Sequence, residues 1–186
     1  MKRTSAATSL ALLFTTVFVL GIGSGAQAEE SRSVKMKFSG TNVATTHNLG
    51  PNTITDETHL TGNGSLGAFT FRELHADGAS PQPPVGCSGP NFAVVAGAGV
   101  FTFEDGSLLV VTVADGSACI DLAAGNAAIT VNYEISGGTG HFREASGKLR
   151  MSGTLMVVLR DASNAPVLLT NTGRIRGTIF GVKHWE

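Results

Sequence analysis

Residues 135–149 read ISGGTGHFREASGKL, and this stretch decides the fold. Gly137, Gly138 and Gly140 lie within four positions, and glycine adopts positive φ angles at little steric cost. We therefore predict a sharp bend at the end of a β-strand. Phe142 is the one aromatic residue in the polar run that follows. It is expected to fold back onto the core that the flanking strands share.

This glycine-rich corner resembles the signature of the allene oxide cyclase and dirigent barrel superfamily, and in particular its small secreted bacterial members. The matching residues are Gly137, Gly138, Thr139, Gly140, Phe142, Ala145 and Gly147, and residues 66–70 match an upstream Leu-Gly-x-Phe-Thr strand. The resemblance implies a barrel over about residues 34–181. In plants, similar proteins cyclise an oxidised fatty acid or direct radical coupling. Because the motif is a structural corner, the resemblance carries over the fold and no catalytic residue.

Short alternating segments on both sides of the corner predict an all-β chain. Residues 40–67 are rich in Thr, Asn and Gly, which predicts a long connection with at most one short strand. Asp105-Gly106 and Asp115-Gly116, each flanked by apolar residues, predict two hairpin turns. The expected strands cover residues 34–38, 68–75, 92–103, 108–114, 127–135, 148–160 and 167–180.

Seven or eight strands in up-and-down order favour a closed antiparallel β-barrel of about eight strands, because closure removes exposed strand edges. A two-sheet sandwich is the alternative. On the outer face, Glu134, Arg150, Arg174 and Arg176 have the opposite parity to their apolar neighbours. They are expected to form weak cross-strand charge pairs.

Residues 1–28 have the pattern of a secretory signal peptide, with Lys2 and Arg3 before an apolar run and an Ala-x-Ala ending at Ala28. The apolar run is too short to span a bilayer, so no membrane span is expected after signal removal. Residues 29–186 are then a single barrel domain, secreted or periplasmic, in which a homo-oligomer is compatible with the sequence.

Cys87 and Cys119 are the only two cysteines. In an exported chain, a single pair predicts a disulfide bond. The alternative is a metal-binding or catalytic thiol, which is disfavoured because no C-x-x-C motif accompanies the pair.

Composition and motifs exclude several classes of function. The formal net charge is −1 and no basic run occurs along the chain, which argues against a nucleic-acid partner. No phosphate loop, H-E-x-x-H or G-x-S-x-G motif is present, and Gly138-Thr139-Gly140 lacks the third glycine of a dinucleotide loop. We therefore expect no cofactor and no metal.

One local pattern points to chemistry. Strand parity places Glu73 and His75 on the same face as Phe69 and Phe71. If that face is the barrel interior, a carboxylate and an imidazole lie about 6–7 Å apart in the lumen and are candidates for acid–base catalysis. The favoured interpretation, however, is that the strand turns outward at its end, so that both groups meet water.

Three functional interpretations remain at this point. The favoured one is a non-catalytic module that binds an apolar small molecule or an envelope partner. The second is a cofactor-independent cyclase or isomerase that uses Glu73 and His75 in the lumen. The third is an envelope interaction protein that acts through residues 40–67. An open lumen with Glu73 and His75 inside favours the second, and a lumen filled with side chains favours the third.

Overall fold

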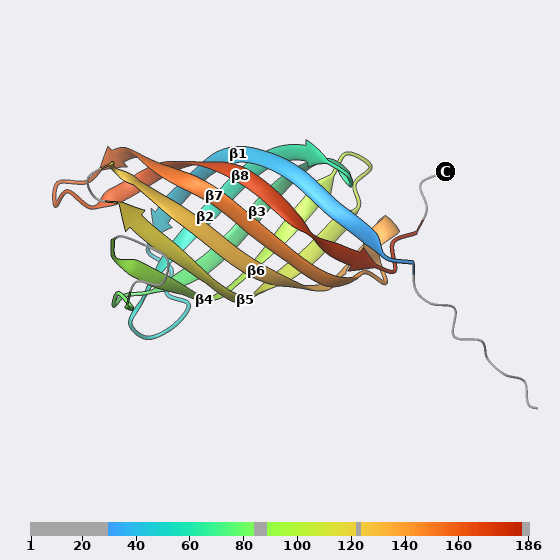
Figure 1. Cartoon of the computed structure of the whole chain (residues 1–186), viewed down its shortest axis with the longest axis horizontal. Helices are drawn as coiled ribbons and strands as arrows, with labels where there is room; N and C mark the ends of the chain where they lie inside the picture. Colours follow the sequence, from blue (N-terminus) through green and yellow to red (C-terminus); the bar gives the residue numbers. More distant parts are fainter. Residues whose placement is uncertain (1–29, 84–88, 122–123, 184–186) are drawn as a thin grey trace, which may run out of the picture.

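The computed structural model describes residues 30–83, 89–121 and 124–183, which form a closed barrel (Figure 1). Each strand pairs antiparallel with its neighbours in sequence, and β1 also pairs with β8, which closes the sheet. The predicted closed barrel is confirmed and the sandwich is excluded. The strands are β1 (Arg32–Thr45), β2 (Thr53–Gly64), β3 (Gly67–Gly78), β4 (Asn91–Phe103), β5 (Leu108–Asp121), β6 (Asn126–Gly138), β7 (Ser146–Arg160) and β8 (Pro166–Phe180).

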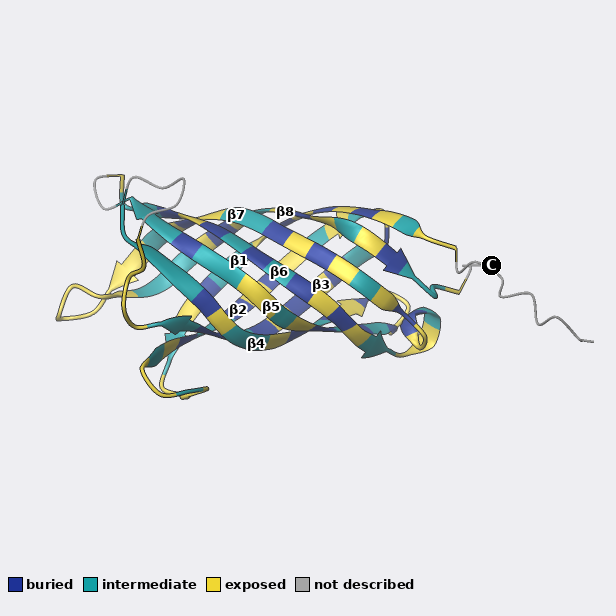
Figure 2. Ribbon diagram, turned by 60° about the horizontal axis from the view of Figure 1, so that its bottom comes forward, coloured by how far each residue is buried: buried dark blue, intermediate teal, exposed yellow. Residues whose placement is uncertain are grey.

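Side chains alternate between the lumen and the outside, as the bands of buried and exposed residues in Figure 2 show. Aromatic rings fill the lumen toward the end where β3 begins. The rings of Phe71 and Phe101 stack with centroids 4.2 Å apart, and Tyr133 contacts Phe71 edge-on at 6.1 Å. Such contacts add to the free energy gained by burying the rings. This half of the barrel is therefore a packed core.

Glycines on neighbouring strands make room for these rings. A Cβ at Gly99 would lie 2.5 Å from the ring of Phe71, which no real side chain tolerates. Gly62 leaves space for Phe69 in the same way. Large and small residues thus alternate around the wall, which lets a narrow barrel close over aromatic side chains.

The predicted corner closes the same end of the barrel. Gly140 begins the short 3₁₀ helix η1 (Gly140–Phe142) with a φ of +57°, and a Cβ there would overlap Ser107 Oγ. Phe142 is fully buried, and its ring centroid lies 4.7 Å from that of Phe103. The other corner glycines flank this turn: Gly137 and Gly138 end β6, and Gly147 lies at the start of β7.

The interpretation of residues 40–67 as a long connection is wrong. This segment contains the end of β1, a connection at residues 46–52, and the 12-residue strand β2. The backbone N–H and C=O groups of β2 pair with β1 on one side and with β3 on the other. This pairing makes the segment a strand although its amino-acid composition is not typical of one. The third functional interpretation therefore loses its long loop.

The second predicted hairpin turn is also wrong. Asp115 and Gly116 lie inside β5, next to a register shift between Val113 and Asp115. At a β-bulge one strand carries an extra residue and then continues in the same direction. The Asp-Gly pair therefore marks a bulge within β5, and the chain does not reverse there. Gly116 is required here because a Cβ would lie 2.9 Å from that of Val94 on β4.

Several sequence predictions lie outside the described residues. The predicted signal peptide of residues 1–28 and Cys87 are among these, while Cys119 lies on β5. The disulfide and the processing site therefore stay predictions. Within the described ranges, no helix is long and apolar enough to cross a membrane.

Candidate functional site

The two ends of the barrel differ. One end carries η1 and the short connections at residues 65–66 and 104–107. The other end carries the connections at residues 46–52 and 161–165, the segment that leads into β4 and the segment that follows β5 (Figure 1). We call this second end the loop end. The polar side chains of the lumen gather in the half of the barrel next to it.

β3 carries the centre of this polar cluster. Its inward side chains run from Phe69 and Phe71 at the packed end to Glu73, His75 and Asp77 toward the loop end. Glu73 and His75 are 2% and 1% exposed. The favoured interpretation, in which the strand turns outward and both groups meet water, is therefore wrong.

Glu73 is held from across the lumen. Tyr133 of β6 donates its hydroxyl proton to Glu73 Oε2 over 3.0 Å. His75 Nδ1 lies 3.5 Å from the same oxygen, an ion-pair contact that is too long for a good hydrogen bond. Glu73 Oε1 has no hydrogen-bond partner among the described residues. One oxygen of this carboxylate is therefore anchored and the other is available.

His75 lies between carboxylates. Its Nε2 is 3.9 Å from Asp77 Oδ2, and its Cα partner on β2 is Asp56, whose side chain faces the same way. Burial alone would lower the pKa of His75, but contact with Glu73 and the charges of Asp77 and Asp56 outweigh it and raise the pKa to about 9. The imidazole is therefore protonated at neutral pH.

The pKa values of two acidic neighbours are also raised, because burial disfavours the charged form of a carboxyl group. Burial raises the pKa of Asp77 to about 6 against the opposing charge of His75. Burial likewise raises the pKa of Asp56. For Tyr133, burial and then the neighbouring Glu73 charge hold the phenol pKa well above its usual value. One cluster thus holds a protonated imidazole and a carboxyl that titrates close to neutrality, a pattern found at functional sites.

A second polar row continues the cluster across the wall. Asn171 of β8 donates to Asn42 Oδ1 of β1 over 3.0 Å, and Asn42 donates to Thr58 Oγ1 of β2 over 2.8 Å. Thr58 is the Cα partner of Glu73. Asn171 Oδ1 is buried without a partner in the described part of the chain. A continuous polar belt therefore runs inside the lumen across β8, β1, β2 and β3.

Sequence reasoning found two members of this belt, Glu73 and His75, from parity on one strand. It missed Asp77, which continues the same parity and was available to that argument. The remaining members lie on other strands, and only their register brings them here: Asn42, Asp56, Thr58, Tyr133 and Asn171.

Asp56, His75 and Asp77 also offer ligand atoms within 4.8 Å of one another, a spacing suited to a cation. A metal ion would have to displace the proton that the carboxylates hold on His75, because imidazole binds metals only when neutral. A metal ion and the His75 proton would therefore compete for this position.

Comparison with known proteins adds a likeness of fold. No protein-family profile matches the chain, and no curated protein matches it. Among solved structures, the chain is similar to a pterocarpan synthase dirigent protein at 15% identity and a TM-score of 0.39, covering 92% of this chain and 99% of the other. It is also similar to a second such protein at 15% identity and a TM-score of 0.44, covering 85% and 99%.

Both solved structures are dirigent proteins, the kind of barrel that the corner motif resembles. At this identity and TM-score they carry no weight for ligand or reaction. The barrel assignment rests on the strand pairing, and the functional proposal rests on the polar belt.

Proposed function

We propose that this protein binds a small, largely apolar molecule at the loop end of its lumen. The observation that carries the proposal is the set of buried acceptors without partners in the described residues: Glu73 Oε1, Asp77 Oδ1 and Asn171 Oδ1. Buried polar atoms are almost always hydrogen-bonded, and each unpaired one costs about 1–3 kcal/mol. A ligand with hydroxyl or amine donors removes that cost on binding.

The surrounding wall supports an apolar ligand body. In the same half of the barrel, β6 and β7 carry the buried aliphatic side chains Ile129, Val131 and Leu155, and Leu155 is the Cα partner of Asn171 in the belt. They are smaller than the rings that fill the other half of the lumen. An apolar surface with a few convergent polar groups is the usual composition of a small-molecule site.

Access comes from the loop end. The side chain of Asp77 keeps 17% of its surface exposed, whereas those of Glu73 and His75 are almost completely enclosed. The belt therefore reaches from solvent at Asp77 to the buried pair, and a ligand entering at this end meets Asp77 first.

A second candidate function is a cofactor-independent cyclase or isomerase at the same site. The observation that favours it is the pairing of a proton donor, His75, with carboxylates of Glu73 and Asp77 within 4 Å of the ring. Two titratable groups with differently shifted pKa values can act as acid and base on one substrate. In this role His75 protonates the substrate and a carboxylate accepts a proton from it.

The binding proposal is tested by comparing Glu73→Gln with Glu134→Gln. Glu134 makes a matched control, because it lies on the outer face of β6 in an exposed ion pair with Lys148. Native mass spectrometry of the protein mixed with a metabolite extract identifies retained molecules, whose affinities are then measured by calorimetry. Loss of a charged acceptor is expected to weaken binding by about ten- to a hundredfold in Glu73→Gln, and Glu134→Gln should bind as the unaltered protein does.

Equal affinities for the two variants would contradict the proposed site. Copurification of a stoichiometric metal or nucleotide in place of an apolar molecule would contradict the proposed ligand class. If the retained molecule is converted, loss of turnover in His75→Gln supports the catalytic candidate, and unchanged turnover removes it.

Export is part of the proposal, because the signal-peptide pattern of residues 1–28 motivates it. We expect protein recovered from the medium or periplasm to begin at Glu29. In the same material, denatured without reductant, alkylation should find no free thiol, since Cys87 and Cys119 are predicted to be joined. An intact Met1 would refute export, and two alkylated cysteines would refute the bridge.

A further inference from the structure

Closure of the barrel brings most of the basic residues together on one side. β1, β7 and β8 contain no aspartate or glutamate, and these three strands are neighbours because β8 pairs with both of the others. They hold eight of the 13 Lys and Arg residues: Arg32, Lys35, Lys37, Lys148, Arg150, Arg160, Arg174 and Arg176. One side of the barrel is therefore basic although the whole chain has a formal net charge of −1.

The strand register places the basic side chains in adjacent rows. Arg176 of β8 is the Cα partner of Lys35 on one side and of Arg150 on the other. In the next row, Arg174 is the partner of Lys37 and Ser152. Neighbouring strands lie about 5 Å apart and alternate residues about 7 Å apart, so five cations share an area of about 7 by 10 Å.

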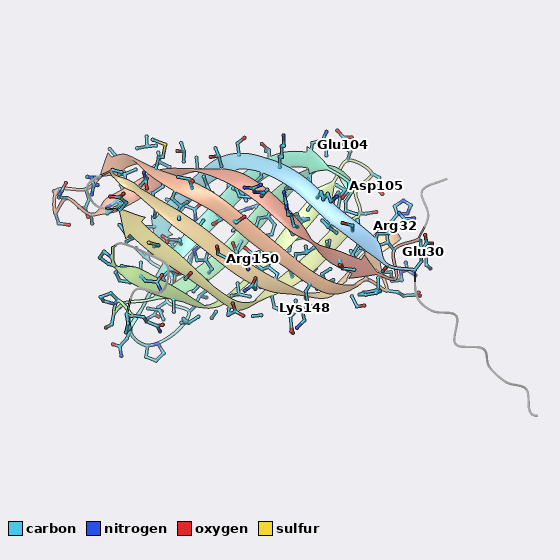
Figure 3. All side chains as sticks on the ribbon, in the orientation of Figure 1. Glu30, Arg32, Glu104, Asp105, Lys148 and Arg150 are labelled. Carbon is cyan, nitrogen blue, oxygen red and sulfur yellow. The ribbon has the colours of Figure 1, made fainter. Side chains whose placement is uncertain are left out.

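These five side chains, which we call the basic patch, are exposed. At the edge of this face, Lys148 forms an ion pair with Glu134 of β6. Lys148 and Arg150, labelled in Figure 3, follow one another along the outside of β7. The expectation that Arg150, Arg174 and Arg176 form cross-strand charge pairs is wrong, because the register sets each of them against a like charge or a neutral residue.

Like charges placed directly opposite each other destabilise a sheet. Five of them on neighbouring strands, none within ion-pair distance of a carboxylate in the described part of the chain, lower the stability of the isolated barrel. A local arrangement that costs stability is expected where a surface binds a partner. The partner that lowers this repulsion carries several negative charges.

The same three strands change character toward the loop end. After the basic rows comes a row of hydroxyl side chains, Thr154, Thr172 and Ser39. The last row is apolar, with Leu159, Leu168 and Val43. Met156 and Leu159 are each 56% exposed, far more than apolar side chains of a closed barrel need to be.

We propose that the face formed by β7, β8 and β1 docks on an anionic lipid bilayer. Lipid phosphates attract the cations of the basic patch, and the apolar row can be buried at the boundary between headgroups and acyl chains. A bilayer therefore offers favourable contacts to both ends of the face. A hydrophilic polyanion such as a nucleic acid or acidic glycan pairs with the cations but leaves the apolar row in water. This surface is separate from the lumen, so the inference does not rest on the proposed ligand.

The test is co-sedimentation of the mature protein with vesicles. We expect binding to phosphatidylcholine vesicles that contain about 30% phosphatidylglycerol, weak binding to pure phosphatidylcholine, and loss of binding as salt rises toward about 0.5 M. Changing Arg150 and Arg176 together to glutamine should weaken binding by about 30-fold, since each cation near such a surface contributes about fivefold.

The matched control changes Arg72 and Arg143 together to glutamine, which alters the net charge equally on other parts of the surface. It should bind as the unaltered protein does, as should the charge-preserving change of Arg150 and Arg176 to lysine. Changing Met156 and Leu159 to serine should weaken vesicle binding by about tenfold. Thermal unfolding confirms that each variant is folded.

Equal binding to neutral and anionic vesicles would overturn the proposal, as would equal losses in the patch and control variants. Inorganic polyphosphate is the soluble probe. Two results would reject the bilayer in favour of a hydrophilic polyanion. One is polyphosphate binding without vesicle binding, and the other is vesicle binding that the serine substitutions at Met156 and Leu159 leave unchanged.

Discussion

Replacing Gly140 with valine is expected to lower the free energy of unfolding by about 3 kcal/mol or more, combining backbone strain of about 1–3 kcal/mol with lost hydrogen bonds of about 1 kcal/mol each. The strain arises because Gly140 has a φ of +57°, which a β-branched residue resists. The hydrogen bonds belong to Ser107 Oγ, which a Cβ at this position would overlap. Ser107 Oγ accepts from the backbone N–H of His141 and donates to Asp105.

The matched control is Gly106→Val. Gly106 has a φ of +79° with open space around its Cβ position, so this variant carries the strain without the overlap. Lys183→Ala, at an exposed ion pair with Glu144, serves as a neutral reference. For a chain of this size, thermal midpoints should fall by about 6–12 °C for Gly140→Val, less for Gly106→Val and little for Lys183→Ala. Equal midpoints for the two valine variants would show that the Ser107 contact does not matter.

Raising the pH from 6.5 to 9 is expected to lower the free energy of unfolding by about 3 kcal/mol, at about 1.4 kcal/mol per unit of pKa difference. The folded protein raises the pKa of His75 to about 9, from an ordinary value of 6.5. The folded state therefore binds this proton more tightly than the unfolded state. Its stabilising effect is complete below pH 6.5 and is lost as the pH rises through 9.

The carboxyl group of Asp77 acts at lower pH but in the same direction. Since the folded pKa of Asp77 is raised to about 6, its ionisation destabilises the fold between about pH 4 and pH 6 and adds no slope above that range. The interval from pH 6.5 to 9 thus isolates His75.

Urea titrations followed by circular dichroism measure the slope, and His75→Gln should abolish it. Glu73→Gln should reduce it, because contact with Glu73 is the largest influence that raises the His75 pKa. His47→Gln, on the exposed connection at residues 46–52, should leave the slope in place. A slope that persists in His75→Gln would show that another group is responsible.

Local sequence patterns predicted strands and their inward side chains correctly where a strand is half-buried and its inner face is apolar. β3 and β4 follow that rule, with Phe69, Phe71, Phe101 and Phe103 all inward. The pattern failed for β2, whose inner face carries Thr58 and Gly62 next to a single large apolar side chain, Leu60. Its strand structure comes from hydrogen bonds to two neighbours, and no residue within β2 encodes those neighbours.

The candidate site was likewise predictable from local sequence only in part. Parity along one strand correctly put Glu73 and His75 on the phenylalanine face, because side chains alternate with a period of two. Their burial depends on closure of the barrel around them. The hydrogen bond from Tyr133 crosses the lumen between residues 60 positions apart, and the one from Asn171 to Asn42 spans 129 positions. No local pattern reports contacts of that range.

The sequence by itself determined the all-β class, the corner at Gly140 and the inward direction of Glu73 and His75, because each depends on φ angles or on alternation within a few residues. Only the tertiary structure decided the polar belt and the basic patch. The basic residues of β1 and β8 lie more than a hundred positions apart in the chain, yet closure makes Lys35 and Arg176 direct neighbours. Electrostatic energy depends on distance in space, so the same residues that read as scattered charges in sequence become one surface in the fold.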